Sequence, residues 1–399
     1  MSTSDRPALV LPALVAAQFA GTSLWFAGNA ILPDIQAAWS LPAGALGWVT
    51  SSVQLGFIVG TLLSAIFTLA DRVSAPRLFF AASVMGALVN LGPLVFEGLW
   101  HLLGFRFLTG VALAGIYPVG MKLAASWYHK GLGSALGWLV GALVLGTAAP
   151  HLVRALGAGS LSWQVVLAVI SALAASGGLL VLLVVGEGPM ATKNSAGFNP
   201  SALGALFRVP RFRAAALGYF GHMWELYAFW AFVPAILASY AAREEVALST
   251  SWASFAIIAA GAIGCVVGGR RALRVGSARV AMIQVVASGA LALTAPLWST
   301  LPTPLFLALL FAWGVVVVGD SPQFSTLNAL TAPRELVGSG LTIVTSIGFG
   351  VTIFSIELVS QLARVFDILW VLPVMAIGPA LSVLAIRSLV ADDPSRSAS

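Results

Sequence analysis

The sequence predicts an all-α polytopic membrane protein with 12 transmembrane helices in two pseudo-symmetric six-helix bundles. Three observations lead to this fold class. Of the 399 residues, 59% are hydrophobic and 9% are charged, whereas a soluble domain carries about 25% charged residues. Apolar runs long enough to cross a membrane recur twelve times along the chain. One long polar connection divides these runs into two sets of six.

Each run has the length that an α-helix needs to cross the hydrocarbon core, about 20 residues. Charged or turn-forming residues separate the runs and mark their ends. Run 1 follows MSTSDR and is too long for the apolar core of a signal peptide, so it is interpreted as a membrane helix. Runs 1 and 4 contain prolines or polar residues, which neighbouring helices can accommodate. The predicted spans are 8–32, 44–70, 77–96, 99–124, 131–153, 161–186, 213–240, 249–269, 278–298, 303–328, 336–361 and 366–388.

Lysine and arginine are distributed unevenly between the two sides of the membrane. An even number of spans places both termini on one side. That side carries 16 of the 20 lysines and arginines, while the other has only Arg154, Arg243 and Arg364. Because positive residues favour the cytoplasmic side, both termini are predicted to be cytoplasmic, in a multi-pass protein of the cell inner membrane.

The long connection, from Glu187 to about Arg211, sets the predicted domain organisation. Residues 1–190 form an amino-terminal six-helix bundle, 191–212 a cytoplasmic central loop, and 213–399 a carboxy-terminal six-helix bundle. Within the loop, the segment NPSALGALFRVPRF predicts a short helix with basic residues at the lipid headgroups.

The two halves resemble each other at matching places. DRVSAPRL (Asp71 to Leu78) follows run 2, and LRVGSARV (Leu273 to Val280) follows run 8, 202 residues later. GSAL (Gly133 to Leu136) follows run 4, and GSGL (Gly338 to Leu341) follows run 10, 205 residues later. A nearly constant offset across a six-plus-six arrangement is typical of internally duplicated transporters.

Composition and motifs exclude several other classes. The net charge of +6 and pI near 10.0 come from cations at the ends of apolar runs, without the basic and aromatic clusters that bind nucleic acid. A lone cysteine, Cys265, offers no disulfide and no thiolate metal site, so packing is its expected role. The sequence has no HExxH and no GxxxxGK[ST] motif. It therefore predicts no enzyme, no metal site and no cofactor.

LADRVSAPRL (Leu69 to Leu78) resembles the cytoplasmic signature G-x-L-A-D-R-x-G-R-K of the major facilitator superfamily of secondary transporters. Asp71 and Arg72 match this pattern, whereas both glycines and the basic pair are replaced, leaving Arg77 as the remaining cation. RFLTG (Arg106 to Gly110) resembles the arginine and glycine signature of helix 4 in that family. The resemblance implies that Asp71, Arg72 and Arg77 act in gating, with Asp71 latching cytoplasmic helix ends in the outward-open state.

Ionisable residues within the runs are the candidates for function, because a charge at the bilayer centre costs about 2.5–3.5 kcal/mol on insertion scales. His222 and Glu225 are three positions apart and therefore neighbours on one helical face. Burial disfavours the charged form of a carboxyl and a nearby cation favours it, so Glu225 suits a proton that binds and leaves. The alternative is a neutral carboxyl bonded to a neighbouring helix. Asp320 precedes Pro322, which should break the local helix. We assign proton coupling to Glu225, His222 and Asp320.

Arg106 is the predicted anion site, because it keeps its charge at any physiological pH and needs an anionic partner. Snorkelling to the outer interface is the alternative. By resemblance, runs 1, 4, 7 and 10 line the solute cavity, and aromatic side chains there would stack on a flat organic solute. The predicted substrate-binding residues are Arg106, Tyr117, Trp25, Asn29, Trp224 and Tyr227.

These observations predict a secondary active transporter that moves a small polar or anionic solute, organic or inorganic, by proton-coupled alternating access. A proton-driven drug or metabolite efflux pump is the alternative, although a lipophilic cation would favour uncompensated carboxylates over a deep arginine. The predicted partners are the solute, H+ and the lipid bilayer, without nucleic acid, and the protein is expected to be a monomer.

Overall fold

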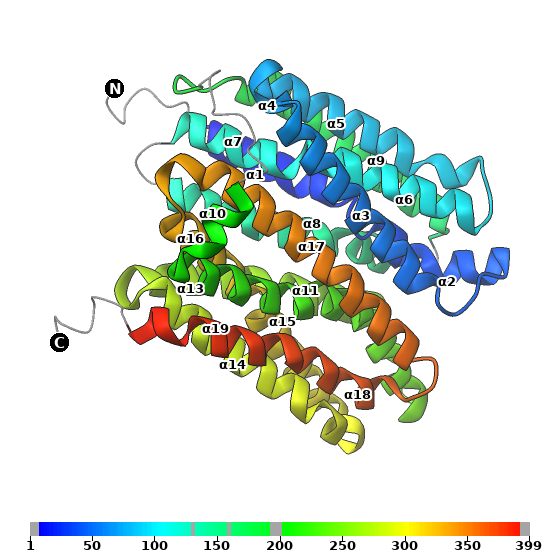
Figure 1. The fold of residues 1–399 in the computed structure, drawn as a ribbon. Helices are drawn as coiled ribbons and strands as arrows, with labels where there is room; N and C mark the ends of the chain where they lie inside the picture. Colours follow the sequence, from blue (N-terminus) through cyan, green and yellow to red (C-terminus); the bar gives the residue numbers. More distant parts are fainter. Residues whose placement is uncertain (1–7, 129–131, 158–160, 192–201, 392–399) are drawn as a thin grey trace. The chain divides into compact units, whose positions relative to one another are not determined.

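The computed structural model describes residues 8–128, 132–157, 161–191 and 202–391 (Figure 1). Within these ranges every regular element is a helix, and twelve spans are long and apolar enough to cross a membrane. The predicted all-α class with twelve transmembrane helices is confirmed. The chain divides into two compact units, Met1–Gly197 and Phe198–Ser399, each with six spans.

The amino-terminal unit contains spans 1 to 6. Its spans are mostly single helices, but spans 1 and 4 are each built from two helices in sequence. The short helix α4 (Leu69–Arg72) joins spans 2 and 3, and the turns η2 (Gly92–Leu94) and η3 (Val181–Val185) extend spans 3 and 6. The main helices are α1 (Val10–Thr22), α2 (Ala27–Trp39), α3 (Ala45–Ile66), α5 (Ala75–Asn90), α6 (Leu99–Ala114), α7 (Tyr117–Trp127), α8 (Leu132–Leu156) and α9 (Trp163–Leu180).

The carboxy-terminal unit contains spans 7 to 12. The short helix α10 (Ala202–Arg208) precedes them, where the sequence predicts a short helix. The long helix α11 packs along α19 (Figure 1). The elements are α11 (Pro210–Arg243), α12 (Thr250–Ala259), α13 (Gly261–Val275), α14 (Ser277–Thr294), η4 (Ala295–Thr300), α15 (Thr303–Gly319), α16 (Ser321–Thr331), η5 (Arg334–Leu336), α17 (Val337–Leu362), α18 (Ile368–Val371), η6 (Leu372–Ala376) and α19 (Ile377–Ala391).

The fourth span of each unit is broken at an equivalent place. In span 4, α6 ends before Gly115 and α7 begins just before Pro118; in span 10, α15 ends at Gly319 and α16 begins just before Pro322. The two prolines are 204 residues apart, close to the offset of the sequence repeats. Proline has no N–H to donate and its ring clashes with the preceding turn, so each break follows from the local sequence.

Glycines allow the second and fourth spans of each unit to cross with their backbones nearly in contact. They are Gly56 and Gly110 in the amino-terminal unit, and Gly264 and Gly314 in the carboxy-terminal unit. A Cβ atom on any of the four would lie between 1.8 and 2.1 Å from a carbonyl oxygen of the partner helix. Only glycine fits such crossings, which small residues favour in membranes. Close helix crossings at glycines therefore occur within each of the two units.

The predicted end of run 1 is wrong. Run 1 was expected to end at residue 32, but its second helix α2 continues through Pro33 and Asp34 to Trp39. Arg154 of α8 donates two hydrogen bonds to the Asp34 carboxylate, at 2.6 and 2.7 Å, and another to Ala30 O at 2.9 Å. These contacts stabilise the last turns of the span, so its proline and acidic residue do not end the helix.

Candidate functional site

Arg106 fills a break in span 1 of the amino-terminal unit. Residues 23–26 separate α1 from α2, and the regular pattern of backbone hydrogen bonds is interrupted there. The Arg106 Nη1 and Nη2 atoms both donate to Leu24 O, at 3.1 Å, and Nη2 also donates to Trp25 O. A Cβ on Gly28 would lie 2.9 Å from Arg106 Cδ and Nε. The break and the glycine together make the space that the guanidinium occupies.

Two predicted substrate-binding residues lie near this break and bond to α3. The Trp25 indole N–H donates to Gln54 Oε1 at 3.1 Å, and the Asn29 amide donates to Thr50 Oγ1 at 2.7 Å. Asn29 Oδ1, Gln54 Nε2 and Arg106 Nε are buried without a hydrogen-bond partner among the described residues. Buried polar atoms are rarely left unsatisfied, so this group has unused capacity to bind a polar ligand.

The Arg106 charge has no counter-ion in the described part of its unit. The residue is 3% exposed, and its guanidinium donates to the backbone carbonyls of Leu24 and Trp25. The carboxylate of Asp34 forms an ion pair with Arg154 instead. Carbonyl dipoles stabilise a guanidinium but do not neutralise it, so the site attracts an anion.

Glu225 lies in a triangle of hydrogen bonds within the carboxy-terminal unit. Its Oε1 atom accepts from Ser288 Oγ and from Trp313 Nε1, both at 2.7 Å, and these two partners are 3.1 Å apart. The Trp313 ring packs against Phe229, with ring centroids 4.6 Å apart. α11, α14 and α15 each contribute one corner, so the carboxyl joins three spans.

His222 and Asp320 form a second buried polar group in this unit. His222 Nδ1 lies 2.8 Å from Asp320 Oδ1, and both residues are at most 3% exposed. Asp320 stands at the break in span 10. His222 Nε2 has no hydrogen-bond partner within the described residues, and its ring lies against Phe324. Ionisable side chains buried at membrane depth are costly, so this pair is a candidate for function.

Cys265 forms a hydrogen bond with the backbone at the break in span 10. Pro322 cannot donate to the carbonyl of Val318, four residues earlier, and the Cys265 thiol donates to that oxygen at 3.4 Å. The sequence predicts only packing for this cysteine, whereas its thiol also donates to Val318 O, which the backbone N–H of Asp320 contacts as well.

The other predicted aromatic residues have separate surroundings. The Trp224 indole N–H donates to Val374 O at 3.1 Å. Tyr227 is buried, with its ring centroid 5.1 Å from that of Phe349 and 5.2 Å from that of Trp230. Tyr117 is half-buried at the start of α7, immediately after the break in span 4.

The predicted gating residues lie on α4 and at the start of α5. Arg72 is exposed and donates from Nε to Thr68 Oγ1 at 3.1 Å, and Arg77 is exposed. The side chain of Asp71 lies outside the described residues.

Sequence reasoning missed four residues of these groups: Gln54, Thr50, Ser288 and Trp313. Each is an uncharged polar or amphipathic side chain within a membrane span, and such residues are more often packing or interface groups. Their roles follow from which helices pack together, and neither repeat nor motif marks them.

Two six-span units, each with ionisable side chains held at membrane depth, define a polytopic transport protein. The model of the Major Facilitator Superfamily matches residues 14–356, and the chain belongs to that family. The family resemblance and the prediction of a transporter rather than an enzyme are thereby confirmed.

Similar proteins include curated sequences and solved structures. The chain is 31% identical to the niacin transporter NiaP of Acinetobacter baylyi, over 30% of this chain and 29% of that protein. It is 34% identical to the uncharacterised transporter YcaD of Salmonella arizonae, over 30% of each. The matches thus span less than a third of these relatives. The nucleoside transporter NupG has a TM-score of 0.73 at 18% identity, covering 95% of this chain and 99% of that one. A bacterial homologue of the lysosomal transporter Spinster has a TM-score of 0.66 at 16% identity, covering 96% and 98%.

Proposed function

We propose that the protein is a proton-coupled secondary transporter of a small polar or anionic solute, working by alternating access. The observation that carries the proposal is the buried guanidinium of Arg106, whose charge has no carboxylate partner in the described part of its unit. An anionic group of the solute would supply the missing counter-charge. The unused donor and acceptor atoms of Gln54 and Asn29 would orient its polar groups.

The carboxy-terminal unit supplies groups that suit proton coupling. Glu225 can exist as a neutral carboxyl or as a carboxylate that Ser288 and Trp313 stabilise by hydrogen bonds. The pair of His222 and Asp320 offers a second place where a proton can bind. A pH gradient can drive transport only through such titratable groups, since Arg106 keeps its charge.

A test compares fluxes into proteoliposomes of organic acids, inorganic anions and cationic dyes, with and without a pH gradient. We expect an anion to respond to the gradient. Glu225→Gln should abolish that response and leave solute exchange measurable, because the amide keeps the shape but not the proton. Glu357→Gln is the matched control, since Glu357 lies in α17 and bonds to Gln361. Full gradient-driven flux in Glu225→Gln would refute its role.

A drug or metabolite efflux pump is the second candidate. The neighbouring rings of Tyr227, Trp230 and Phe349 favour it, because they form an aromatic cluster in the carboxy-terminal unit, with Tyr227 edge-on to Trp230 and tilted against Phe349. In the flux panel, gradient-driven transport of dyes but not of anions would favour this candidate.

We further propose that both termini are cytoplasmic and that the protein resides in the cell inner membrane, from the excess of cations on the terminal side. In a Cys265→Ser background, a cysteine at Ser195 should react with impermeant thiol reagents from the cytoplasmic side. A cysteine at Ser249 should react from the outer side. The opposite pattern would reverse the topology.

A further inference from the structure

The carboxy-terminal unit has a pocket of about 490 Å³ at the end that carries the start of α11. The first residues of α14 and the last residues of α16 and α19 also line it. Because consecutive spans alternate in direction, all these helix ends lie on the same face of the membrane, the side of the chain termini. The pocket is therefore at the level of the lipid headgroups.

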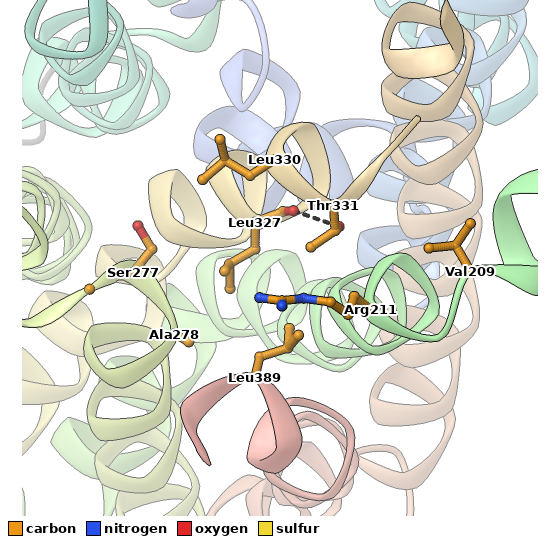
Figure 2. Close-up of a pocket in the computed structure, with 9 residues that line it drawn as sticks. Val209, Arg211, Ser277, Ala278, Leu327, Leu330, Thr331 and Leu389 are labelled. Atoms are coloured by element: carbon orange, nitrogen blue, oxygen red, sulfur yellow. Dashed lines mark hydrogen bonds between the residues drawn. The ribbon is translucent and has the colours of Figure 1, made fainter. Parts of the chain in front are cut away.

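Arg211 provides the charge of this pocket. Figure 2 shows its side chain extending between Leu327 and Leu389 toward Ala278. Arg211 has no hydrogen bond or ion pair with any described residue. A guanidinium presents a planar fork of donors that matches a phosphate group. The pocket thus combines apolar walls with an available cation.

The start of α14 adds a second source of positive potential. Gly276, with φ of 84°, turns the chain into the helix, and no side chain caps it. The first backbone N–H groups, including those of Ser277 and Ala278, have no partner within the helix and carry the positive end of its dipole. These residues line the same pocket as Arg211.

The surrounding face is strongly basic. On this end of the described unit, nine arginines stand against one carboxylate, Glu335. Such a face attracts the anionic lipids of the adjacent leaflet, and basic pockets between membrane helices bind their headgroups. The arginines are Arg208, Arg211, Arg213, Arg270, Arg271, Arg274, Arg279, Arg334 and Arg387.

We propose that this pocket binds the phosphate headgroup of an anionic phospholipid, with Arg211 and the start of α14 as its ligands. The volume lies in the range of small-molecule pockets. Leu327, Leu330 and Leu389 provide apolar surface for the part of the lipid that adjoins its headgroup. A lipid fits better than a soluble anion because the pocket lies at headgroup depth and its walls are mostly apolar. The site does not depend on which solute is transported.

The test measures binding of phosphatidylglycerol to the delipidated protein in neutral detergent, by native mass spectrometry. Phosphatidylcholine and glycerol 3-phosphate are the comparison ligands. Arg211→Ala removes the cation, Ser277→Leu fills the pocket without changing charge, and Arg334→Ala removes one cation from the same face outside the pocket. We expect Arg211→Ala to weaken binding about tenfold or more, and Arg334→Ala about fivefold or less.

Phosphatidylglycerol binding that Ser277→Leu and Arg211→Ala both reduce, with Arg334→Ala close to wild type, would support the site. Equal losses in the two arginine variants would show attraction to surface charge alone and overturn it. Binding that Ser277→Leu leaves unchanged would also overturn it, because the lipid would then lie outside the pocket. Displacement of the lipid by an equal concentration of glycerol 3-phosphate would assign the pocket to a soluble phosphate instead.

Discussion

Two roles are expected for Arg106, and different substitutions of it can separate them. Its guanidinium donates hydrogen bonds to backbone carbonyls at the break in span 1, and its charge would bind an anionic solute. Its Nη atoms serve two carbonyl oxygens, Leu24 O and Trp25 O. A buried carbonyl that loses its donor costs about 1–3 kcal/mol. Arg106→Ala removes the hydrogen bonds to both carbonyls and should destabilise the protein by about 2–6 kcal/mol. That is a large part of a typical unfolding free energy of about 5–15 kcal/mol.

Arg106→Lys keeps the charge but loses the planar fork. The shorter donor group can serve one of the two carbonyls, so we expect a destabilisation of about 1–3 kcal/mol. If the solute is an anion, loss of the bidentate contact should raise its dissociation constant about 10–100-fold. Unfolding in detergent measures the first effect. Equilibrium binding of the best anion from the flux panel measures the second.

Arg154→Lys is the matched control, because Arg154 also makes forked contacts within the same unit but pairs with the carboxylate of Asp34. It should change stability without changing the affinity for the solute. Anion affinity that is unaltered in both Arg106→Lys and Arg106→Ala would refute the anion site. Unaltered stability in both would refute the capping of the broken span.

Gly28→Ala should destabilise the protein by about 1–3 kcal/mol in thermal unfolding, because the new Cβ would lie 2.9 Å from Arg106 Cδ and Nε. Gly104→Ala on the same helix as Arg106 meets nothing within 4 Å and should be nearly neutral; equal effects of the two would contradict the packing at Gly28. Trp313→Phe keeps most of the ring but removes the N–H that Glu225 accepts. A double-mutant cycle with Glu225→Gln should give a coupling energy of about 1 kcal/mol or more, and a value near zero would argue against the contact.

The spans were predictable from sequence because a chain crosses lipid as a helix that satisfies its own backbone hydrogen bonds. Each span therefore appears in the sequence as a window of about 20 predominantly apolar residues. The exception is instructive. Run 1 was predicted to end before Pro33, yet the helix continues there and breaks instead at residues 23–26. No proline marks that break. It exists because Arg106 from another span satisfies the carbonyls, and that contact joins residues 82 positions apart.

In the candidate site, too, some residues could be predicted from the local sequence, whereas others depend on contacts between distant parts of the chain. Glu225, His222 and Asp320 could be selected because an ionisable residue in an apolar run is costly wherever it packs. Their partners could not be selected in the same way. Placing Ser288 or Trp313 in a membrane helix costs little free energy, so neither stands out in the sequence. The packing of the helices in this unit brings them to Glu225.

Backbone carbonyls at the broken spans accept hydrogen bonds from different kinds of side chain in the two units. In span 1 the carbonyls of Leu24 and Trp25 accept from Arg106, a donor that stays charged at every physiological pH. In span 10 the carbonyl of Val318, four residues before Pro322, accepts from the neutral thiol of Cys265, and the adjacent Asp320 carboxyl lies 2.8 Å from His222 Nδ1. The break in span 1 therefore contacts a permanent cation, whereas the break in span 10 has a buried pair of a carboxyl and an imidazole beside it. If proton binding is coupled to a change of helix geometry, we expect the coupling to act at span 10, because side chains of the kind that can exchange a proton adjoin its break.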